Sequence, residues 1–162
     1  MRQFNEEQNA VILRNKDTVY RLARAGTKNP HDADDVFQEV FLRYLRKQPT
    51  FESAEHERYW FIRVTINCTH SAMTTFWRRQ VEPLEDGLTE DFDDEPVDAE
   101  DLKAALEQLD RRHRLVLHLF YYEDLPVKDV AEALSVSEAN ARMLLTRARR
   151  ALKEILEKEN AK

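Results

Sequence analysis

The sequence predicts an all-α protein made of two small helical modules that are joined by a flexible acidic linker. The chain has 162 residues, which is enough for two small domains. It contains only 2 glycines, too few for the turns of a β-sandwich or barrel. Residues 81–100 carry 10 acidic and no basic side chains, while residues 1–80 and 101–162 are nearly balanced. Such dense like charge, with two prolines and a glycine, favours a linker over a packed element.

The first module, residues 1–80, is predicted to contain three helices. Apolar residues recur at helical spacing over residues 11–23, and Gly26 and Pro30 end the run. A second helix begins with acids, which complement the partial positive charge of a helix N-terminus, and it ends at Pro49. These acids are Asp32, Asp34 and Asp35. The third helix is expected over about residues 55–76, with an apolar face and a polar face.

The second module, residues 101–162, is predicted to contain four shorter helices. Apolar residues at helical spacing indicate two helices before Pro126 and a third over residues 127–134. Ser137 is a good N-cap for the last helix, which is expected over about residues 138–157. At 1.5 Å per residue that helix is roughly 30 Å long.

The last two predicted helices have the form of a helix-turn-helix, in which a short helix, a tight turn and a longer helix follow one another. Ala131 stands where the two helices must approach closely, and Val136 is the apolar residue of the turn. The longer helix gathers the cations that neutralising DNA phosphates requires, namely Arg142, Arg147, Arg149, Arg150 and Lys153. Its N-terminal end would face base edges with Ser137, Glu138, Asn140 and Met143. The alternative is a solvated helix whose cations complement its C-terminal partial charge.

A second candidate site interleaves aromatic side chains with arginines in residues 59–67 and again in residues 76–79. Single-stranded nucleic acid is bound in this way, because unstacked bases lie on aromatic rings while cations meet the backbone. The candidates are Arg63, Asn67, Phe76, Trp77, Arg78 and Arg79. The alternative is that the aromatic residues belong to the core and that the last two arginines only end a helix.

The acid-rich stretch of residues 32–41 is a third candidate. Paired carboxylates can form a metal site or a general acid–base pair, but no histidine or further carboxylate stands at a supporting spacing. We therefore predict no catalytic residue here. Instead we expect a protein-docking face around an exposed Phe37, formed by Asp35, Gln38 and Glu39.

The composition argues against several other functional classes. The single cysteine, Cys68, allows no intrachain disulfide, and the five histidines are too scattered for a metal site. Two glycines cannot supply the phosphate-binding motifs of nucleotide enzymes. No apolar run approaches the roughly 20 residues of a membrane span, and the N-terminus has no apolar signal core. We therefore expect a cytoplasmic protein without metal, cofactor or membrane insertion.

In their order and spacing, the three candidate sites resemble the extracytoplasmic-function sigma factors of bacteria, the smallest members of the sigma-70 family. The stretch "DADDVFQEVFLRYL" (32–45) is similar to their second conserved region. The stretch "YWFIRVTINCTHSAMTTFWRR" (59–79) resembles their promoter-melting segment. The stretch "LDRRHRLVLHLFYYEDLPVKDVAEALSVSEANARMLLTRARRALKE" (109–154) resembles their fourth region. The resemblance covers nearly the whole chain.

The resemblance implies a sigma factor without chemistry of its own, which binds core RNA polymerase and directs promoter-specific initiation. In the family, one set of positions binds the clamp helices of the largest polymerase subunit. The matching residues in this chain are Asp35, Gln38, Glu39 and Phe41. The segment that recognises and opens the −10 element contains Arg63, Asn67, Trp77, Arg78 and Arg79. The helix that reads the −35 element contains Ser137, Asn140, Arg142, Met143, Thr146 and Arg147. The linker would thread the polymerase channel, and an anti-sigma factor is a further expected partner.

Three positions depart from the family pattern. Ser135 stands in the turn where members often have glycine, so its backbone is expected to need an adjusted conformation. Leu144 replaces a usual basic residue, which removes one phosphate contact, and Ser71 replaces a common Asp near the −10 segment.

Two rival functions remain open on the sequence. One is an interaction protein that binds polymerase or an anti-sigma partner without promoter specificity. The other is a helix-turn-helix regulator that acts on duplex DNA alone. Such a regulator needs neither the docking face of residues 32–41 nor the aromatic and basic cluster of residues 76–79.

Overall fold

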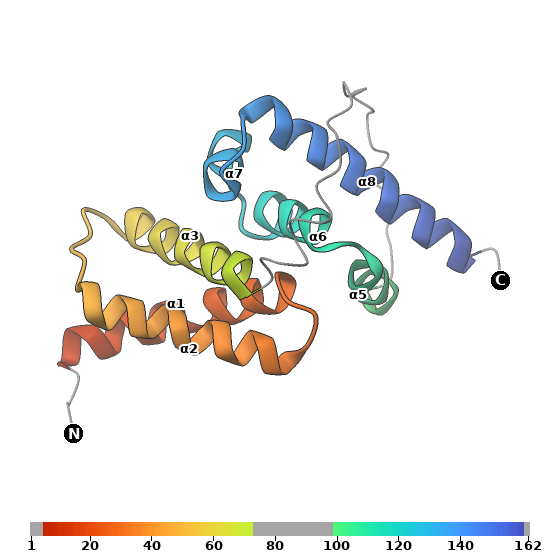
Figure 1. Cartoon of the computed structure of the whole chain (residues 1–162). Coiled ribbons are helices and arrows are strands. Elements are labelled where there is room, and N and C mark those ends of the chain that lie inside the picture. The colour runs from red at the N-terminus through yellow and green to blue at the C-terminus, as the bar shows by residue number, and fades with distance from the viewer. Residues whose placement is uncertain (1–4, 73–98, 161–162) are drawn as a thin grey trace. The chain divides into compact units, whose positions relative to one another are not determined.

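The computed structural model describes residues 5–72 and 99–160, and these residues divide between two compact units, Met1–Val81 and Glu82–Lys162. Every regular element in the described ranges is helical (Figure 1). The all-α prediction is therefore confirmed. In the same ranges no helix is both long and apolar enough to cross a membrane, and no cluster of side chains could hold a metal ion.

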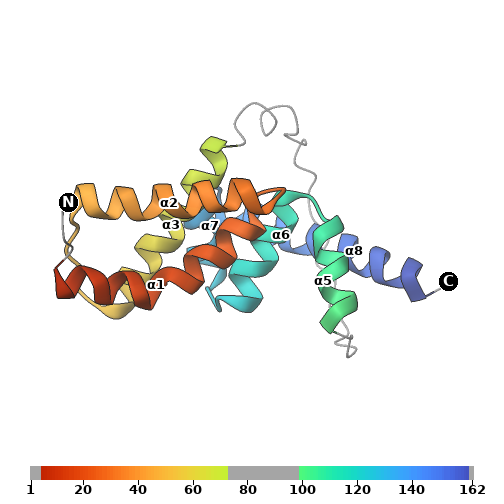
Figure 2. The same cartoon turned by 90° about the horizontal axis from the view of Figure 1, so that it is seen from below.

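The first unit is a three-helix bundle of α1 (Glu6–Ala25), α2 (Pro30–Lys47) and α3 (Ala54–Ala72), each of which packs against the other two. Helices α1 and α2 run side by side in opposite directions, and α3 crosses them (Figures 1 and 2). The centre of the bundle is filled by fully buried side chains, among them Val19, Leu22, Val40, Phe61 and Ile62. Burial of this apolar surface, at about 25 cal/mol per Å², is the main stabilising contribution.

Local sequence signals set the ends of these helices. Asn5 and Gln8 form a capping box at the start of α1, in which each side chain accepts a hydrogen bond from the other's backbone N–H. Asn29 caps α2, with Pro30 in the first turn, and Gln48 ends α2 in the left-handed region. Because α2 begins at Pro30, only Asp32 of the three predicted acids lies in its first turn.

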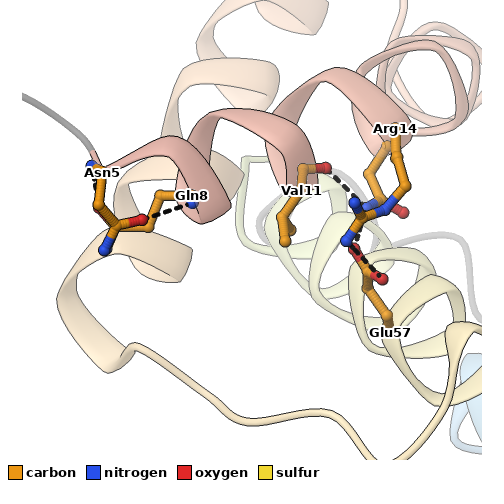
Figure 3. A network of polar contacts seen from close by, with 6 residues as sticks. Asn5, Gln8, Val11, Arg14 and Glu57 are labelled. Atoms are coloured by element: carbon orange, nitrogen blue, oxygen red, sulfur yellow. Dashed lines mark hydrogen bonds and ion pairs between the residues drawn. The ribbon is translucent and has the colours of Figure 1, made fainter.

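A buried carboxylate links α1 to α3 (Figure 3). Glu57 accepts two hydrogen bonds from Nη2 of Arg14, at 3.0 and 3.2 Å, and one from Nδ2 of Asn15 at 3.0 Å. The Asn15 amide also donates to the carbonyl of Val11 at 2.8 Å. Since an unpaired buried charge is costly, these donors fix the start of α3 against the middle of α1.

The glycine at the end of α1 allows a close approach between α1 and α3. A Cβ atom at Gly26 would lie 2.7 Å from Cγ2 and 2.9 Å from Cβ of Thr69, a fully buried residue of α3. Gly26 has an ordinary backbone conformation with φ −94°, so the requirement for glycine here is space and not a left-handed turn.

The second unit contains α5 (Ala99–Gln108), α6 (Arg111–Leu117), the single π-helical turn η1 (His118–Tyr122), α7 (Val127–Leu134) and α8 (Glu138–Asn160). The long helix α8 packs against α5, α6 and α7 (Figure 1). The predicted bounds of α7 are confirmed, whereas α8 runs three residues further than expected. The π-helical turn was not predicted.

The predicted linker of residues 81–100 lies outside the described residues, except for its last two, which begin α5. The predicted end of the third helix, residues 73–76, also lies outside them.

Candidate functional site

Helices α7 and α8 form the helix-turn-helix that the sequence predicts. The buried Ala131 lets the helices approach, and its carbonyl accepts a hydrogen bond from the N–H of Val136 at 2.9 Å. Ser135 has φ 58° and ψ 42°, the left-handed conformation that glycine adopts most easily. The expected backbone adjustment at this serine is therefore confirmed.

Ser137 fixes the beginning of α8. Its hydroxyl oxygen accepts a hydrogen bond from the backbone N–H of Asn140 at 3.1 Å, and its carbonyl accepts one from Ala141 at 2.9 Å. This is the arrangement of a helix N-cap, as predicted. The N-terminal end of α8 therefore has a defined direction relative to α7.

One face of α8 is buried in the unit and another is open. The buried face comprises Ala141, Leu144, Leu145, Thr146 and Ala148. Among the predicted DNA-reading residues, Ser137 and Arg142 are exposed, while Asn140, Met143 and Arg147 are half-buried. Thr146 is only 8% exposed, and its hydroxyl donates to the carbonyl of Arg142 at 3.1 Å, so its side chain contributes to packing.

Leu144 faces the interior together with its neighbour Leu145. A cation at this position would have to leave water, which is costly without a partner. The departure from the family pattern at Leu144 therefore strengthens the core of this unit and removes no side chain from its open face.

Two of the cations on α8, Arg142 and Arg149, have partners within the chain that the geometry defines. Arg142 pairs with Glu138, with Nη2 and Oε1 2.8 Å apart. Arg149 donates from Nε to the hydroxyl of Tyr121 at 2.6 Å and lies over the rings of Phe120 and Tyr121. The π-helical turn therefore contacts the middle of α8.

The outer face of α2 is a mixed surface of charged, polar and apolar side chains. Asp35 and Gln38 are exposed, as predicted. Glu39 is half-buried, and its Oε1 lies 3.1 Å from Nε of Arg43 and 3.9 Å from Nη1 of Arg46. The carboxylate of Glu39 is thus held by two cations of its own helix.

The two aromatic residues of the predicted docking face lie deeper than expected. Phe37 is half-buried and packs edge-on against Phe41 and Tyr20, with ring centroids 4.9 and 6.1 Å away, so the expectation that Phe37 is exposed is wrong. Phe41 is 8% exposed and also packs on Phe61. Phe41 therefore belongs to the core of the bundle, where it packs α2 against α3.

The sequence analysis missed Leu42, whose side chain is 46% exposed. It lies seven residues after Asp35 and four after Gln38, which places all three on one face of the helix. The 3.6-residue period could have identified it, because an apolar residue in phase with the polar stripe is unusual.

On α3 the polar face is formed as predicted. Arg63 and Asn67 are exposed one turn apart, while Ile62 and Ile66 point into the bundle. Ser71 donates from its hydroxyl to the carbonyl of Asn67 at 3.1 Å, a bond within its own helix. The predicted partners Phe76, Trp77, Arg78 and Arg79 lie outside the described residues.

Comparison with known families matches both units. Residues 11–81 match Sigma-70 region 2, and residues 105–154 match Sigma-70, region 4. The chain belongs to the sigma-70 family. Curated relatives of this chain bear the names of extracytoplasmic-function members. The chain is 30% identical to the ECF RNA polymerase sigma factor SigF of Caulobacter vibrioides, over 77% of this chain and 71% of that protein.

Two further relatives have similar names. The chain is 28% identical to the ECF RNA polymerase sigma factor SigE of Mycolicibacterium smegmatis over 93% of its own length, but it spans only 62% of that longer protein. It is 29% identical to the RNA polymerase sigma factor SigV of Bacillus subtilis, over 88% of this chain and 84% of the relative. The family is one of transcription initiation factors and not of known enzymes.

A solved structure has the same fold. It is that of the sigma factor RpoE from Bartonella quintana in complex with the anti-sigma factor NepR. The TM-score is 0.71 at 20% identity, and the match covers 94% of this chain and 98% of that one.

Proposed function

We propose that this chain binds core RNA polymerase and directs promoter-specific transcription initiation as an extracytoplasmic-function sigma factor. The observation that carries the proposal is the succession, in one chain, of a region 2 bundle and a region 4 helix-turn-helix whose second helix begins with an open polar end. A regulator that acts on duplex DNA alone needs only the second of these units.

We assign a separate task to each part of the chain. Residues 1–80 bind core polymerase and recognise and open the −10 element, residues 81–100 link the modules, and residues 101–162 recognise the −35 element. At the −35 element the N-terminal end of α8 enters the major groove, where base edges are read. The contacts with the −35 element are assigned to Ser137, Asn140, Arg142, Met143 and Arg147, and Thr146 packs the helix against the rest of the unit.

Polymerase docking is assigned to the outer face of α2. Asp35, Gln38 and the Glu39–Arg43 ion pair supply polar contacts, and the half-buried Phe37 supplies an apolar edge. Such a surface suits a helical partner, because interface centres combine apolar anchors with satisfied polar groups. Phe41 acts here as support for the helix.

Promoter opening is assigned to the polar face of α3, with Arg63 and Asn67, together with Phe76, Trp77, Arg78 and Arg79. Extruding a base costs a few kcal/mol of stacking, so the receiving surface must offer aromatic rings and polar groups. The support for this assignment is the sequence pattern and the exposure of the two α3 residues.

An anti-sigma factor is proposed as a further partner, because the solved relative RpoE is bound to one. We further infer that the chain acts in the cytoplasm, uses no cofactor and catalyses no reaction itself.

Run-off transcription tests the proposal. Purified core polymerase is incubated with and without the chain on a library of promoters, and transcripts are sequenced from their 5′ ends. The expected result is a set of start sites that depends on the chain and shares elements near −10 and −35. Retention on core polymerase without start-site selection would favour the interaction protein, and DNA binding without retention would favour the stand-alone regulator.

A further inference from the structure

The exposed beginning of α8 holds an ion pair where DNA is proposed to bind. Nη2 of Arg142 donates to Oε1 of Glu138 at 2.8 Å, one helical turn apart. The arginine side chain is 59% exposed and the glutamate side chain 48%, so both can reach a ligand. Among the arginines of the described part of α8, Arg142 is exposed, whereas Arg147, Arg149 and Arg150 are half-buried.

A carboxylate at this position needs an explanation. DNA presents a dense row of phosphates, and an acid at the contacting end of a helix repels them. An acid in the first turn also complements the helix dipole and forms a favourable i,i+4 pair, but both effects are small at an exposed site. Both effects stabilise the free chain. Neither offsets the repulsion between the Glu138 carboxylate and the phosphates when DNA is bound.

We infer that Glu138 is a positioning residue that aims Arg142 at a guanine of the −35 element; the inference rests on the proposed function. A guanidinium has five N–H donors in a fixed plane, and Glu138 engages one of its nitrogens. The remaining donors are enough for the two acceptors, O6 and N7, that guanine displays in the major groove. Adenine displays a donor at N6 in the same place and is rejected.

The carboxylate also changes what an exposed arginine does on DNA. A free arginine side chain near the backbone swings to the nearest phosphate, which gives affinity without sequence information. A guanidinium tied to Glu138 is restrained to the end of the helix that enters the groove. The pair therefore lowers the affinity for DNA of any sequence and raises the discrimination between bases. Removing the Glu138 carboxylate should strengthen binding to random DNA and weaken the preference for guanine.

Four variants of the full chain separate these effects in holoenzyme. Glu138→Gln removes the charge, and Glu138→Asp keeps the charge near the helix N-terminus but shortens the reach to Arg142 by one methylene. Arg142→Lys keeps the cation without the planar fork. Glu154→Gln is the matched control, because it removes an exposed acid from the same helix four turns away.

Each holoenzyme selects active promoters from a library that is randomised over the −35 element, and its binding to a random duplex is measured at several salt concentrations. For the unaltered chain we expect one position with a guanine preference of roughly tenfold or more, as a bidentate arginine contact provides. Arg142→Lys and both Glu138 variants should lower that preference several-fold at that position alone. Glu138→Gln should also bind random DNA more tightly, while Glu154→Gln should keep the selected sequence.

The outcomes are distinct. If the unaltered chain selects no −35 sequence, the proposed function itself fails. If it selects one and Glu138→Gln selects the same sequence with the same strength, the positioning role is wrong. The role is also wrong if Glu138→Asp matches the unaltered chain while Glu138→Gln does not, because charge and not reach would then decide.

Discussion

Replacing Gly26 with alanine should destabilise the three-helix bundle through one steric contact. The added methyl would lie 2.7, 2.9 and 3.0 Å from Cγ2, Cβ and Oγ1 of Thr69. Thr69 has no room to rotate away, since it is fully buried and its hydroxyl donates to the carbonyl of Ile66 at 2.7 Å. Either the end of α1 or the middle of α3 must therefore shift.

The size of the effect follows from two opposing contributions. Inserting a methyl into a filled core costs about 1–3 kcal/mol. Alanine also reduces the freedom of the unfolded chain, which returns about 0.4–1 kcal/mol. The net loss is expected to be about 1–2 kcal/mol, which lowers the melting temperature of a unit of this size by roughly 4–8 °C for each kcal/mol.

Tryptophan fluorescence during urea unfolding reports this unit alone, because Trp60 and Trp77 both lie before residue 82. A double-mutant cycle with Thr69→Ala should show a coupling of about 1 kcal/mol or more, since the smaller side chain makes room for the methyl. Thr65→Ala is the control: Thr65 is also a fully buried threonine of α3, bonded to the carbonyl of Phe61 at 2.6 Å, and its effect should be additive. A Gly26→Ala chain as stable as the original, or equal coupling to both threonines, would refute the reasoning.

Three further results are expected. Ser135→Gly should raise the unfolding free energy of the second unit by about 0.5–1 kcal/mol in circular dichroism melts, because glycine adopts φ 58° without strain; a loss of stability would contradict this. Burial raises the pKa of the Cys68 thiol above its ordinary value of 9.0; the charge of Glu39 adds to this shift and the charge of Arg43 opposes it. The unfolded thiol then ionises first, so stability of the bundle is lost as the pH rises above 9.0, and Cys68→Ala should lack this loss in urea titrations at successive pH values. Arg147→Ala should weaken −35 binding and reduce the slope of log affinity against log salt by about 1; footprints with an unchanged slope would exclude a phosphate contact.

The helices could be predicted because their signals are local. Helical periodicity, the glycine after α1, the serine cap before α8 and the proline before α7 each act within a few residues, and the structure agrees with them. The unusual backbone of Ser135 was also predicted, because family members often have glycine at this place in the turn. The π-helical turn had no such signal, since the apolar spacing of Leu115, Val116, Leu119 and Phe120 indicates a helix but not its type.

The sequence predicts which face of a helix a side chain lies on better than it predicts how deeply that side chain is buried. Phe37 and Phe41 lie on the side of α2 that turns toward α1 and α3, where a ring cluster that includes Tyr20 and Phe61 encloses them. Thr146 is enclosed in the same way in the second unit. Which residue at the border of a stripe is covered depends on side chains from other helices, and the spacing within one helix does not contain that information.

Ion pairs within each candidate surface change what that surface can recognise. Glu39 lies beside Arg43 and Arg46, and Arg142 lies beside Glu138, so at both surfaces a partner would meet groups that already have an opposite charge next to them. A paired group loses less freedom on binding than a solvated one, and it cannot turn to an arbitrary opposite charge. On the proposed function, we expect both surfaces to prefer partners with a defined arrangement of donors and acceptors. Specificity would then come from the geometry of these pairs, although the net charge of −6 for the whole chain opposes DNA binding.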